Sequence, residues 1–193
     1  MNAATMSYAT TGNYAAPLRV DALPLGTIVY DQGPQADDLL AHIAAVLAVE
    51  GYRLGGAVQS SKRRPGRRKC DMYLRNLLDG EEILISLDRG NEARGCRLNH
   101  DAFARVSLWG EQALSAGVDL FVVNKFGKEE AQGRGLRALI AEALATGIPV
   151  ILAVSTLNLP HFEAFAGDQV VRLPPQREAV LAWCRTAIAP TRM

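Results

Sequence analysis

The stretch Asp119-Leu-Phe-Val-Val-Asn-Lys-Phe-Gly-Lys-Glu-Glu130 decides the fold, because an apolar run ends abruptly in polar residues that then open a helix. Its core, Val118–Val123, and a second run, Ile148–Val154, are nearly all apolar and show no alternation. Strands buried on both faces have this composition, and such strands belong to parallel sheets that helices cover. The sequence therefore predicts a three-layer α/β fold with a mostly parallel sheet.

The rest of the chain alternates expected strands and helices around these two runs. Asp79-Gly80 joins two of the strands and predicts an antiparallel hairpin with a type I′ turn, whose two central residues need positive φ. Residues 26–193 are expected to form one domain, and residues 1–25 a peripheral N-terminal arm. The expected strands are 26–30, 52–59, 71–78, 82–87, 118–124, 148–154 and 169–173, and the expected helices are about 36–50, 101–116, 130–146, 160–166 and 175–188.

Composition excludes several classes of protein. The chain has 193 residues, of which 49% are hydrophobic and 21% charged, and it contains no apolar run near the ~20 residues that cross a bilayer. Three cysteines without CxxC spacing favour a reducing, cytoplasmic location. The net charge is +1, but the segment 62–69 alone carries six positive charges, so the basicity is local.

The first strand runs into Asp31-Gln-Gly-Pro-Gln-Ala-Asp-Asp38, where a phosphate loop would read GxxxxGK[ST]. On that template Ala36, Asp37 and Asp38 occupy the three signature positions. At the end of the 118–124 strand, where such proteins place an acidic pair, this chain has Asn124-Lys125. An acid therefore stands where the phosphate lysine belongs, and a lysine stands where an acid belongs.

At 123–136, Val-Asn-Lys-Phe-Gly-Lys-Glu-Glu-Ala-Gln-Gly-Arg-Gly-Leu, the chain resembles an uncharacterised bacterial domain family. That family is similar to a nucleoside-triphosphatase family with a P-loop fold, whose acidic strand reads roughly DEIGKME, and some members are labelled molybdenum-transport ATP-binding proteins. The resemblance spans about residues 26–173 and implies a P-loop-like fold. Further matches, in order, are Asp31, Gln59, Cys70-Asp-Met72, Arg89-Gly90, Gly95-Cys-Arg-Leu98 and Gly147-Ile-Pro-Val150.

Ligands of open α/β sheets bind beyond the carboxyl ends of the strands. Four segments are expected to meet there: 31–38, 59–70, 124–134 and 155–161. We predict that a nucleotide would contact Gly33 and Gln35, and we predict no metal site. The predicted ligand-binding residues are Gln59, Arg89, Cys96, Arg97, Asn124, Lys125, Lys128, Glu129 and Arg134.

Several of these residues have two interpretations. Asp37 and Asp38 either begin a helix, where carboxylates favour the dipole, or belong to a ligand site. Lys125 either forms an ion pair with Asp37, which would explain both charge reversals, or binds an anion. Cys96 is also explained as a small buried residue. Glu129 and Glu130 are expected as helix-start acids, and two glycines around Arg134 either bring it to a ligand or allow close packing.

The function that the sequence favours is binding of a nucleotide or small oxyanion without efficient hydrolysis, and the labels of the family it resembles imply an oxyanion related to molybdate. One alternative is an active nucleoside-triphosphate phosphohydrolase with a metal held by Asp31, Asp37 or Glu129. Another is a protein or nucleic-acid interaction module that uses the basic segment 62–69. The expected partner is a small anionic ligand. Specific binding of nucleic acid, contact with a membrane and a role for magnesium are not expected, and the sequence leaves open whether the chain forms a homo-oligomer.

Overall fold

The computed structural model describes residues 24–63, 65–66, 68–88 and 98–189. Almost all of the predicted N-terminal arm therefore lies outside the described residues. The strands are β1 (Leu25–Tyr30), β2 (Leu54–Lys62), β3 (Asp71–Asn76), β4 (Glu82–Leu84), β5 (Leu120–Phe126), β6 (Val150–Ser155) and β7 (Val170–Leu173). The helices are α1 (Gly33–Val49), α2 (His100–Ala116), α3 (Lys128–Ala131), α4 (Arg137–Ala145), α5 (Leu159–Ala166) and α6 (Arg177–Ile188).

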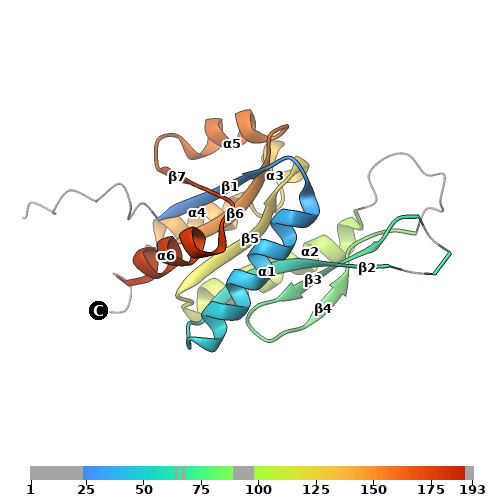
Figure 1. The fold of residues 1–193 in the computed structure, drawn as a ribbon, viewed down its shortest axis with the longest axis horizontal. Helices are drawn as coiled ribbons and strands as arrows, with labels where there is room; N and C mark the ends of the chain where they lie inside the picture. The colour runs from blue at the N-terminus through green and yellow to red at the C-terminus, as the bar shows by residue number, and fades with distance from the viewer. Residues whose placement is uncertain (1–23, 64, 67, 89–97, 190–193) are drawn as a thin grey trace, which may run out of the picture.

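The seven strands form one sheet in the order β4-β3-β2-β5-β6-β1-β7 (Figure 1). Neighbouring strands from β2 to β7 pair in parallel, whereas β3 and β4 extend the sheet in antiparallel pairing. The parallel pairing follows from the crossover helices, since parallel neighbours need a long connection. This architecture confirms the predicted α/β fold with an antiparallel hairpin excursion.

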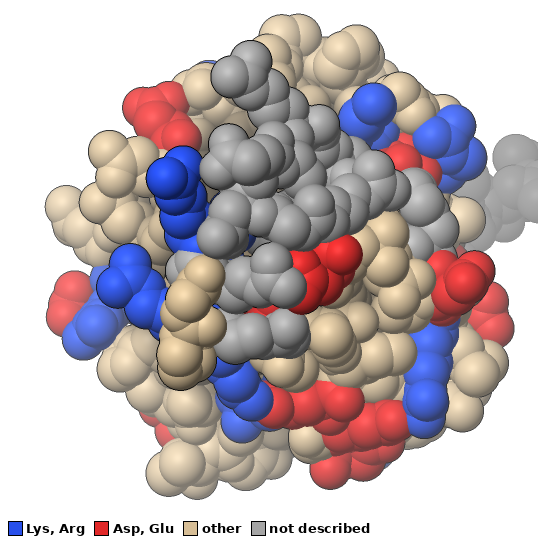
Figure 2. All heavy atoms as spheres, turned by 90° about the vertical axis from the view of Figure 1, so that its right-hand side faces the viewer, with Lys and Arg blue, Asp and Glu red and all other residues tan. Residues whose placement is uncertain are grey.

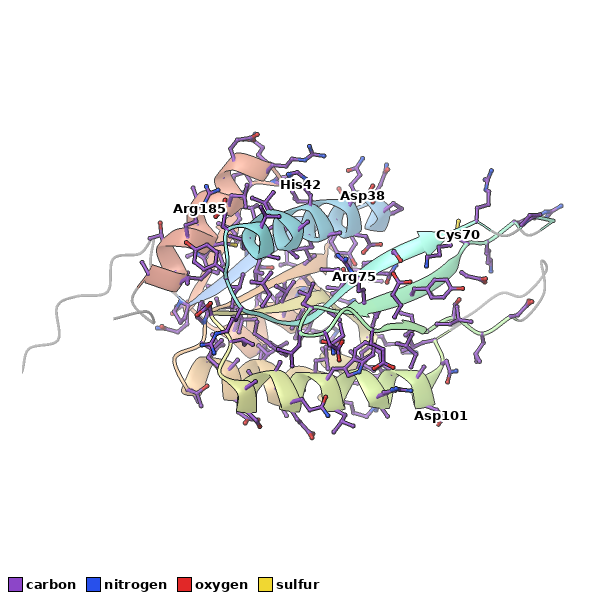
Figure 3. The ribbon with its side chains drawn as sticks, turned by 90° about the horizontal axis from the view of Figure 1, so that it is seen from below. Asp38, His42, Cys70, Arg75, Asp101 and Arg185 are labelled. Carbon is purple, nitrogen blue, oxygen red and sulfur yellow. The ribbon has the colours of Figure 1, made fainter. Side chains whose placement is uncertain are left out.

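Helices cover both faces of the sheet, which gives three layers (Figure 3). One core lies between the sheet and α1 and α6, and the other lies between the sheet and α2, α4 and α5. Residues of β5 enter both cores in alternation: Leu120 and Val122 face α1, while Phe121 and Val123 face α2 and α4. The uninterrupted apolar runs that predicted the fold thus reflect burial on both faces.

The β3–β4 hairpin exists, but the predicted type I′ turn is wrong. Asn76 and Glu81 close a four-residue loop through a backbone bond of 2.8 Å, and Gly80 N donates to Asn76 O over 3.0 Å. Gly80 has φ +82°, whereas no described residue other than glycine has positive φ, so Asp79 does not adopt the I′ conformation. Asp79 instead accepts a bond from Glu81 N, which stabilises a longer turn.

Two predicted helices differ from the structure by more than two residues. The helix expected over 36–50 begins at Gly33, because Pro34 occupies the first turn, where its missing N–H costs nothing. The helix expected over 130–146 is two helices, α3 and α4. Gly133 and Gly135, with φ of +81° and +60°, break it between them. In the described part of the chain, no helix is both long and apolar enough to span a membrane.

Candidate ligand-binding site

The four predicted segments do meet at the carboxyl ends of the parallel strands. Asp37 of α1 bonds to Gln59 of β2 and to the 124–125 pair of β5. Asp31 accepts a 2.9 Å bond from Thr156 Oγ1, which ties the fourth segment to the end of β1. Among the described residues visible in Figure 2, both acidic and basic side chains lie on this face.

Asp37 is the centre of a buried polar network. Lys125 Nζ lies 2.6 Å from Asp37 Oδ1 and 2.9 Å from Oδ2. Asn124 Nδ2 donates to Oδ1 over 2.8 Å, and Gln59 Nε2 donates to Oδ2 over 3.0 Å. Asn124 Oδ1 in turn accepts from Gln59 N, so the network fastens β2, β5 and α1 together. We call Asp37, Gln59, Asn124 and Lys125 the Asp37 network.

The predicted ion pair between Lys125 and Asp37 is thereby confirmed. The alternative in which Asp37 and Asp38 start the helix is wrong, because they are the fifth and sixth residues of α1 and its first turn holds no acid. Asp37 is only 6% exposed, and such donors compensate a buried carboxylate for its lost hydration. The charges that are reversed relative to a phosphate loop therefore satisfy each other.

Lys125 also approaches the start of α1. A Cβ placed on Gly33 would lie 3.5 Å from Lys125 Nζ, and the ammonium lies 6.0 Å from the centroid of the Tyr30 ring. Cations are not favoured at a helix N-terminus, whose partial charge is positive. Asp37 offsets that cost, and the ammonium occupies space beside the turn where a phosphate group would sit in a phosphate loop.

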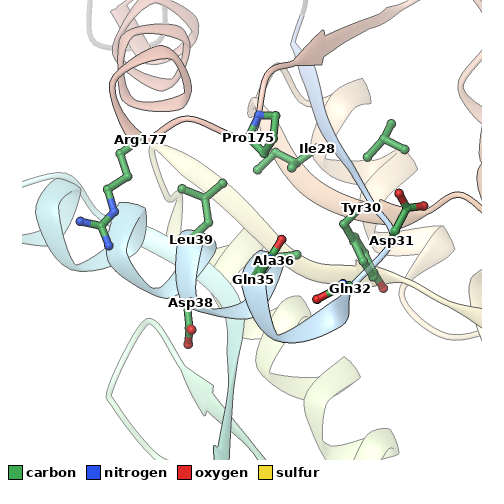
Figure 4. A pocket seen from close by; sticks show the side chains of 11 residues that line it. Ile28, Tyr30, Asp31, Gln32, Gln35, Ala36, Asp38, Leu39, Pro175 and Arg177 are labelled. Carbon is green, nitrogen blue, oxygen red and sulfur yellow. The ribbon is translucent and has the colours of Figure 1, made fainter.

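One cavity of about 570 Å³ lies between the end of β1, the first turns of α1 and the start of α6 (Figure 4). We call it the α1 cavity. Burial, followed by the charge of Asp37, raises the pKa of Tyr30 to about 12, so its hydroxyl stays neutral at pH 7. The cavity is lined by Ile28, Val29, Tyr30, Asp31, Gln32, Gln35, Ala36, Asp38, Leu39, Pro175 and Arg177.

A second cavity of about 240 Å³ lies on the other side of the sheet, against α2, and we call it the β5 cavity. One end is polar and includes three members of the Asp37 network, and the other end is apolar. Its polar lining is Gln59, Asn124, Lys125, Gly127, Lys128, Glu129 and Glu130, and its apolar lining is Ala57, Leu74, Ile85, Leu98, Phe103, Val106 and Leu136.

Glu130 ties together the two ends of the segment that contains α3 and Lys128. Its two carboxylate oxygens accept bonds from Gly127 N (2.8 Å) and Leu136 N (3.0 Å). Gly135 packs so closely that an added Cβ would lie 2.2 Å from Glu130 Oε1. Burial raises the pKa of the Glu130 carboxyl, against the opposing effect of these backbone bonds. Glu129 and Glu130 do lie in the first turn of α3, as predicted.

The structure places the predicted site residues in separate groups. Gln35 lines the α1 cavity and Gly33 lies beside Lys125, whereas Gln59, Asn124, Lys125, Lys128 and Glu129 line the β5 cavity. Arg134 is exposed and bonds to Glu129 and Gln132. Of its two flanking glycines, Gly135 packs against Glu130, whereas a Cβ on Gly133 would meet no atom within 4 Å. Arg89, Cys96 and Arg97 lie outside the described residues.

The carboxylates proposed for a metal are engaged elsewhere. Asp37 accepts three donors, Glu129 pairs with Arg134, and Asp31 accepts from Thr156. Among the described residues, no three His, Cys, Asp or Glu side chains are grouped so that they could hold a metal ion. These residues do not fit the magnesium site of a phosphate-transferring enzyme.

Sequence reasoning missed Tyr30 and Arg177 of the α1 cavity and the burial of Glu130. Arg177 follows β7, and only the pairing of β7 beside β1 brings it near α1. Nothing in the local sequence around Arg177 signals that neighbourhood. Glu130 could have been recognised from its place before Gly133 and Gly135, since a glycine pair inside a helical pattern often has a packing reason.

Comparison with known proteins agrees with the fold. A molybdenum import ATP-binding protein (ModC 2) of Bradyrhizobium diazoefficiens is 35% identical over 177 residues, which is 90% of this chain but 20% of that protein. The chain thus spans about a fifth of that relative's length.

Two solved structures share the fold. The solution structure of a human cancer-related nucleoside triphosphatase matches 86% of this chain and 96% of its own, with a TM-score of 0.56 and 16% identity. The crystal structure of THEP1 from Aquifex aeolicus matches 82% of this chain and 95% of its own, with a TM-score of 0.58 and 15% identity. These likenesses establish a P-loop NTPase-like fold.

The family profile described as "Protein of unknown function (DUF2478)" matches residues 25–183, almost the whole described domain. The chain therefore belongs to the DUF2478 family, and its α/β fold is similar to that of the two solved structures.

Proposed function

We propose that this chain binds a nucleotide in the α1 cavity and does not hydrolyse it efficiently. The observation that carries the proposal is the position of this cavity, at the carboxyl end of β1 and against the first turns of α1. Open α/β sheets bind ligands at such a place, where strand order reverses. Its volume of about 570 Å³ also suits a ligand of nucleotide size.

The walls of the α1 cavity suit the nucleoside part of such a ligand. Leu39 and Pro175 offer apolar surface to a base, and Tyr30 and Gln35 offer hydrogen-bonding groups. Asp31 and Asp38 suit hydroxyl or amino donors but repel phosphate, and Arg177 is the cation of the described lining. We therefore expect the nucleoside to supply most of the affinity, and each added phosphate to add little.

The Asp37 network supports the absence of hydrolysis. Phosphoryl transfer needs positive charge and a metal held in fixed positions around the phosphates. Here Ala36, Asp37 and Asp38 replace the signature residues, and the ammonium of Lys125 is bound to Asp37. The same engagement of acids weighs against the alternative of an active phosphohydrolase with a rearranged metal site.

A second candidate is binding of a small oxyanion at the polar end of the β5 cavity. Lys125 and Lys128 line that end beside Glu129 and Glu130, and the two ammonium groups are hydrogen-bond donors for an anion. The name of the Bradyrhizobium relative makes molybdate one oxyanion to test. In this candidate the predicted residues Gln59 and Asn124 would donate hydrogen bonds.

Calorimetric titration separates the two candidates. The ligands are adenosine, guanosine, their mono-, di- and triphosphates, molybdate and phosphate, each with and without magnesium. We expect a nucleoside to bind within about tenfold of its triphosphate without magnesium, and Leu39→Glu, which places a charge in the apolar wall, to abolish that binding. A triphosphate preference above about 100-fold, or nucleotide binding that Leu39→Glu leaves intact, would refute the proposal. Binding of molybdate alone would favour the second candidate.

A further inference from the structure

We infer that the β5 cavity is a binding site for a small organic anion with an apolar body, such as an aromatic or branched carboxylate. This site is separate from the α1 cavity and does not depend on nucleotide binding there. It uses the lysine end proposed for an oxyanion, but it specifies a different ligand class. The inference rests on the shape, apolar lining and charge of the cavity.

The apolar part of the cavity is a preformed surface. Ala57 and Leu74 come from the sheet, and Val106 and Phe103 come from α2, which packs across it. Ala57, Leu74 and Val106 are each 5% exposed or less, so strand and helix hold these walls rigidly. An apolar cavity of about 150 Å³ accommodates a benzene ring, so about 240 Å³ accommodates a ring with a short arm.

The polar end supplies one available positive charge. Lys125 is bound to Asp37, Glu129 is paired with Arg134, and both oxygens of Glu130 accept backbone N–H groups. No described residue pairs with the exposed ammonium of Lys128, which lines the same end. A ligand carboxylate would therefore meet Lys128 while its apolar body covers the wall between the sheet and α2.

This combination argues against a bare inorganic anion. Molybdate or phosphate would leave the apolar part of the cavity unfilled and would gain only one exposed ionic contact. A neutral apolar molecule would bury the wall but would forgo that contact. An anion with an apolar body is the class that uses both ends of the cavity.

The test uses the full chain and 3-phenylpropionate as the probe, followed by calorimetry and by amide shifts in ¹⁵N spectra. For a ligand of this size we expect a Kd of about 1 mM or tighter. Amides of Ala57, Gly127 and Lys128 should shift, and those of Gln32 and Gln35 should not. The neutral amide of the probe should bind about three- to fivefold more weakly, which is the size of an exposed ionic contact.

Two variants and a control test the assignment. Lys128→Gln should weaken the probe about three- to fivefold, whereas Arg75→Gln should not. Arg75 is exposed on β3 and faces the side of the sheet opposite to Leu74. The Arg75→Gln substitution therefore removes the same charge as Lys128→Gln, but at a place away from the cavity. Ala57→Leu, checked for native circular dichroism, should fill the cavity and weaken binding at least tenfold.

Three results would overturn the inference. The first is absence of saturable binding up to about 10 mM, and the second is shifts confined to the α1 cavity. The third is molybdate or phosphate binding as tightly as the probe with the same shifts at Gly127 and Lys128. The third result would leave oxyanion binding in this cavity as an explanation. None of the three results bears on nucleotide binding in the α1 cavity, so failure of this inference is distinguishable from failure of the proposed function.

Discussion

The ion pair between Lys125 and Asp37 should contribute far more to stability than a surface pair. The Asp37 side chain is 8% exposed and that of Lys125 is 25% exposed, with the ammonium 2.6 Å from Oδ1. Removing one partner of a buried pair costs about 3–5 kcal/mol, and an exposed pair contributes at most about 1 kcal/mol. Because Lys125 is partly hydrated, we place the coupling between these limits, at about 2 kcal/mol.

A double-mutant cycle measures that coupling. Asp37→Asn, Lys125→Met and the double variant are unfolded in urea at pH 7, and the free energies of unfolding are compared with the wild type. Asp37→Asn should cost about 2–4 kcal/mol, because it leaves the ammonium without a counter-charge and disturbs the bonds from Gln59 and Asn124. The double variant should then lose about 2 kcal/mol less than the two single variants summed.

The exposed pair of Glu50 and Arg185 is the matched control. Their side chains are 31% and 45% exposed, and the same cycle with Glu50→Gln and Arg185→Met should give a smaller coupling than the cycle at Lys125 and Asp37, because solvent screens the exposed pair. A coupling at Lys125 and Asp37 no larger than the control value would refute the reasoning. Lys125 would then be available to an anion, and Lys125→Met should weaken anion binding while leaving stability nearly unchanged.

Three further predictions follow from the structure. Gly56→Ala should cost over about 3 kcal/mol in urea unfolding, because its Cβ would lie 2.0 Å from Val122 O. Gly51→Ala, also at positive φ but in open space, should cost only about 1–2 kcal/mol. Because the pKa of Glu130 is raised, its contribution to stability is complete below the ordinary value of 4.5 and is lost as pH rises through the folded-state pKa. The free energy of unfolding of the wild type should therefore exceed that of Glu130→Gln by less at pH 8 than at pH 4. A difference that stays constant with pH would contradict this prediction. Binding of duplex DNA through the basic segment 62–69 should be weak, and the logarithm of its binding constant should fall with the logarithm of salt concentration with a slope near −0.9 per phosphate contact. Sequence-selective submicromolar binding at physiological salt would instead favour the interaction-module alternative.

The sequence was informative where one local pattern had one physical cause. Uninterrupted apolar runs at β5 and β6 can only be buried on both faces, so they predicted the layered parallel sheet. The Lys125–Asp37 pair was predictable because two charges that are each unfavourable near a core become acceptable together. Its prediction also took strands β1 and β5 to be neighbours, as the resemblance to a P-loop fold implies. That premise is wrong, because β6 lies between them, and it is α1 that brings Asp37 to Lys125.

Other features depend on contacts that no local pattern specifies. Gly33-Pro34 is compatible with a loop or with a helix start, and the packing of α1 on the sheet decides for the helix. The position of Glu130 in the sequence is typical of an acid at a helix start. Only its close contact with Gly135 shows that its carboxylate is a buried hydrogen-bond acceptor. The division of the predicted site residues between two cavities depends on which face of the sheet each side chain enters.

The central claim is that the chain binds a nucleotide and leaves it intact. The most direct measurement is one incubation of the protein with labelled ATP and magnesium at saturating concentration, in which bound nucleotide and released phosphate are both quantified; GTP is treated in the same way. We predict about one nucleotide bound per chain, recovered as triphosphate, with phosphate release no faster than in a protein-free control. Absence of bound nucleotide, or magnesium-dependent turnover of about 1 s⁻¹ or faster, would contradict it.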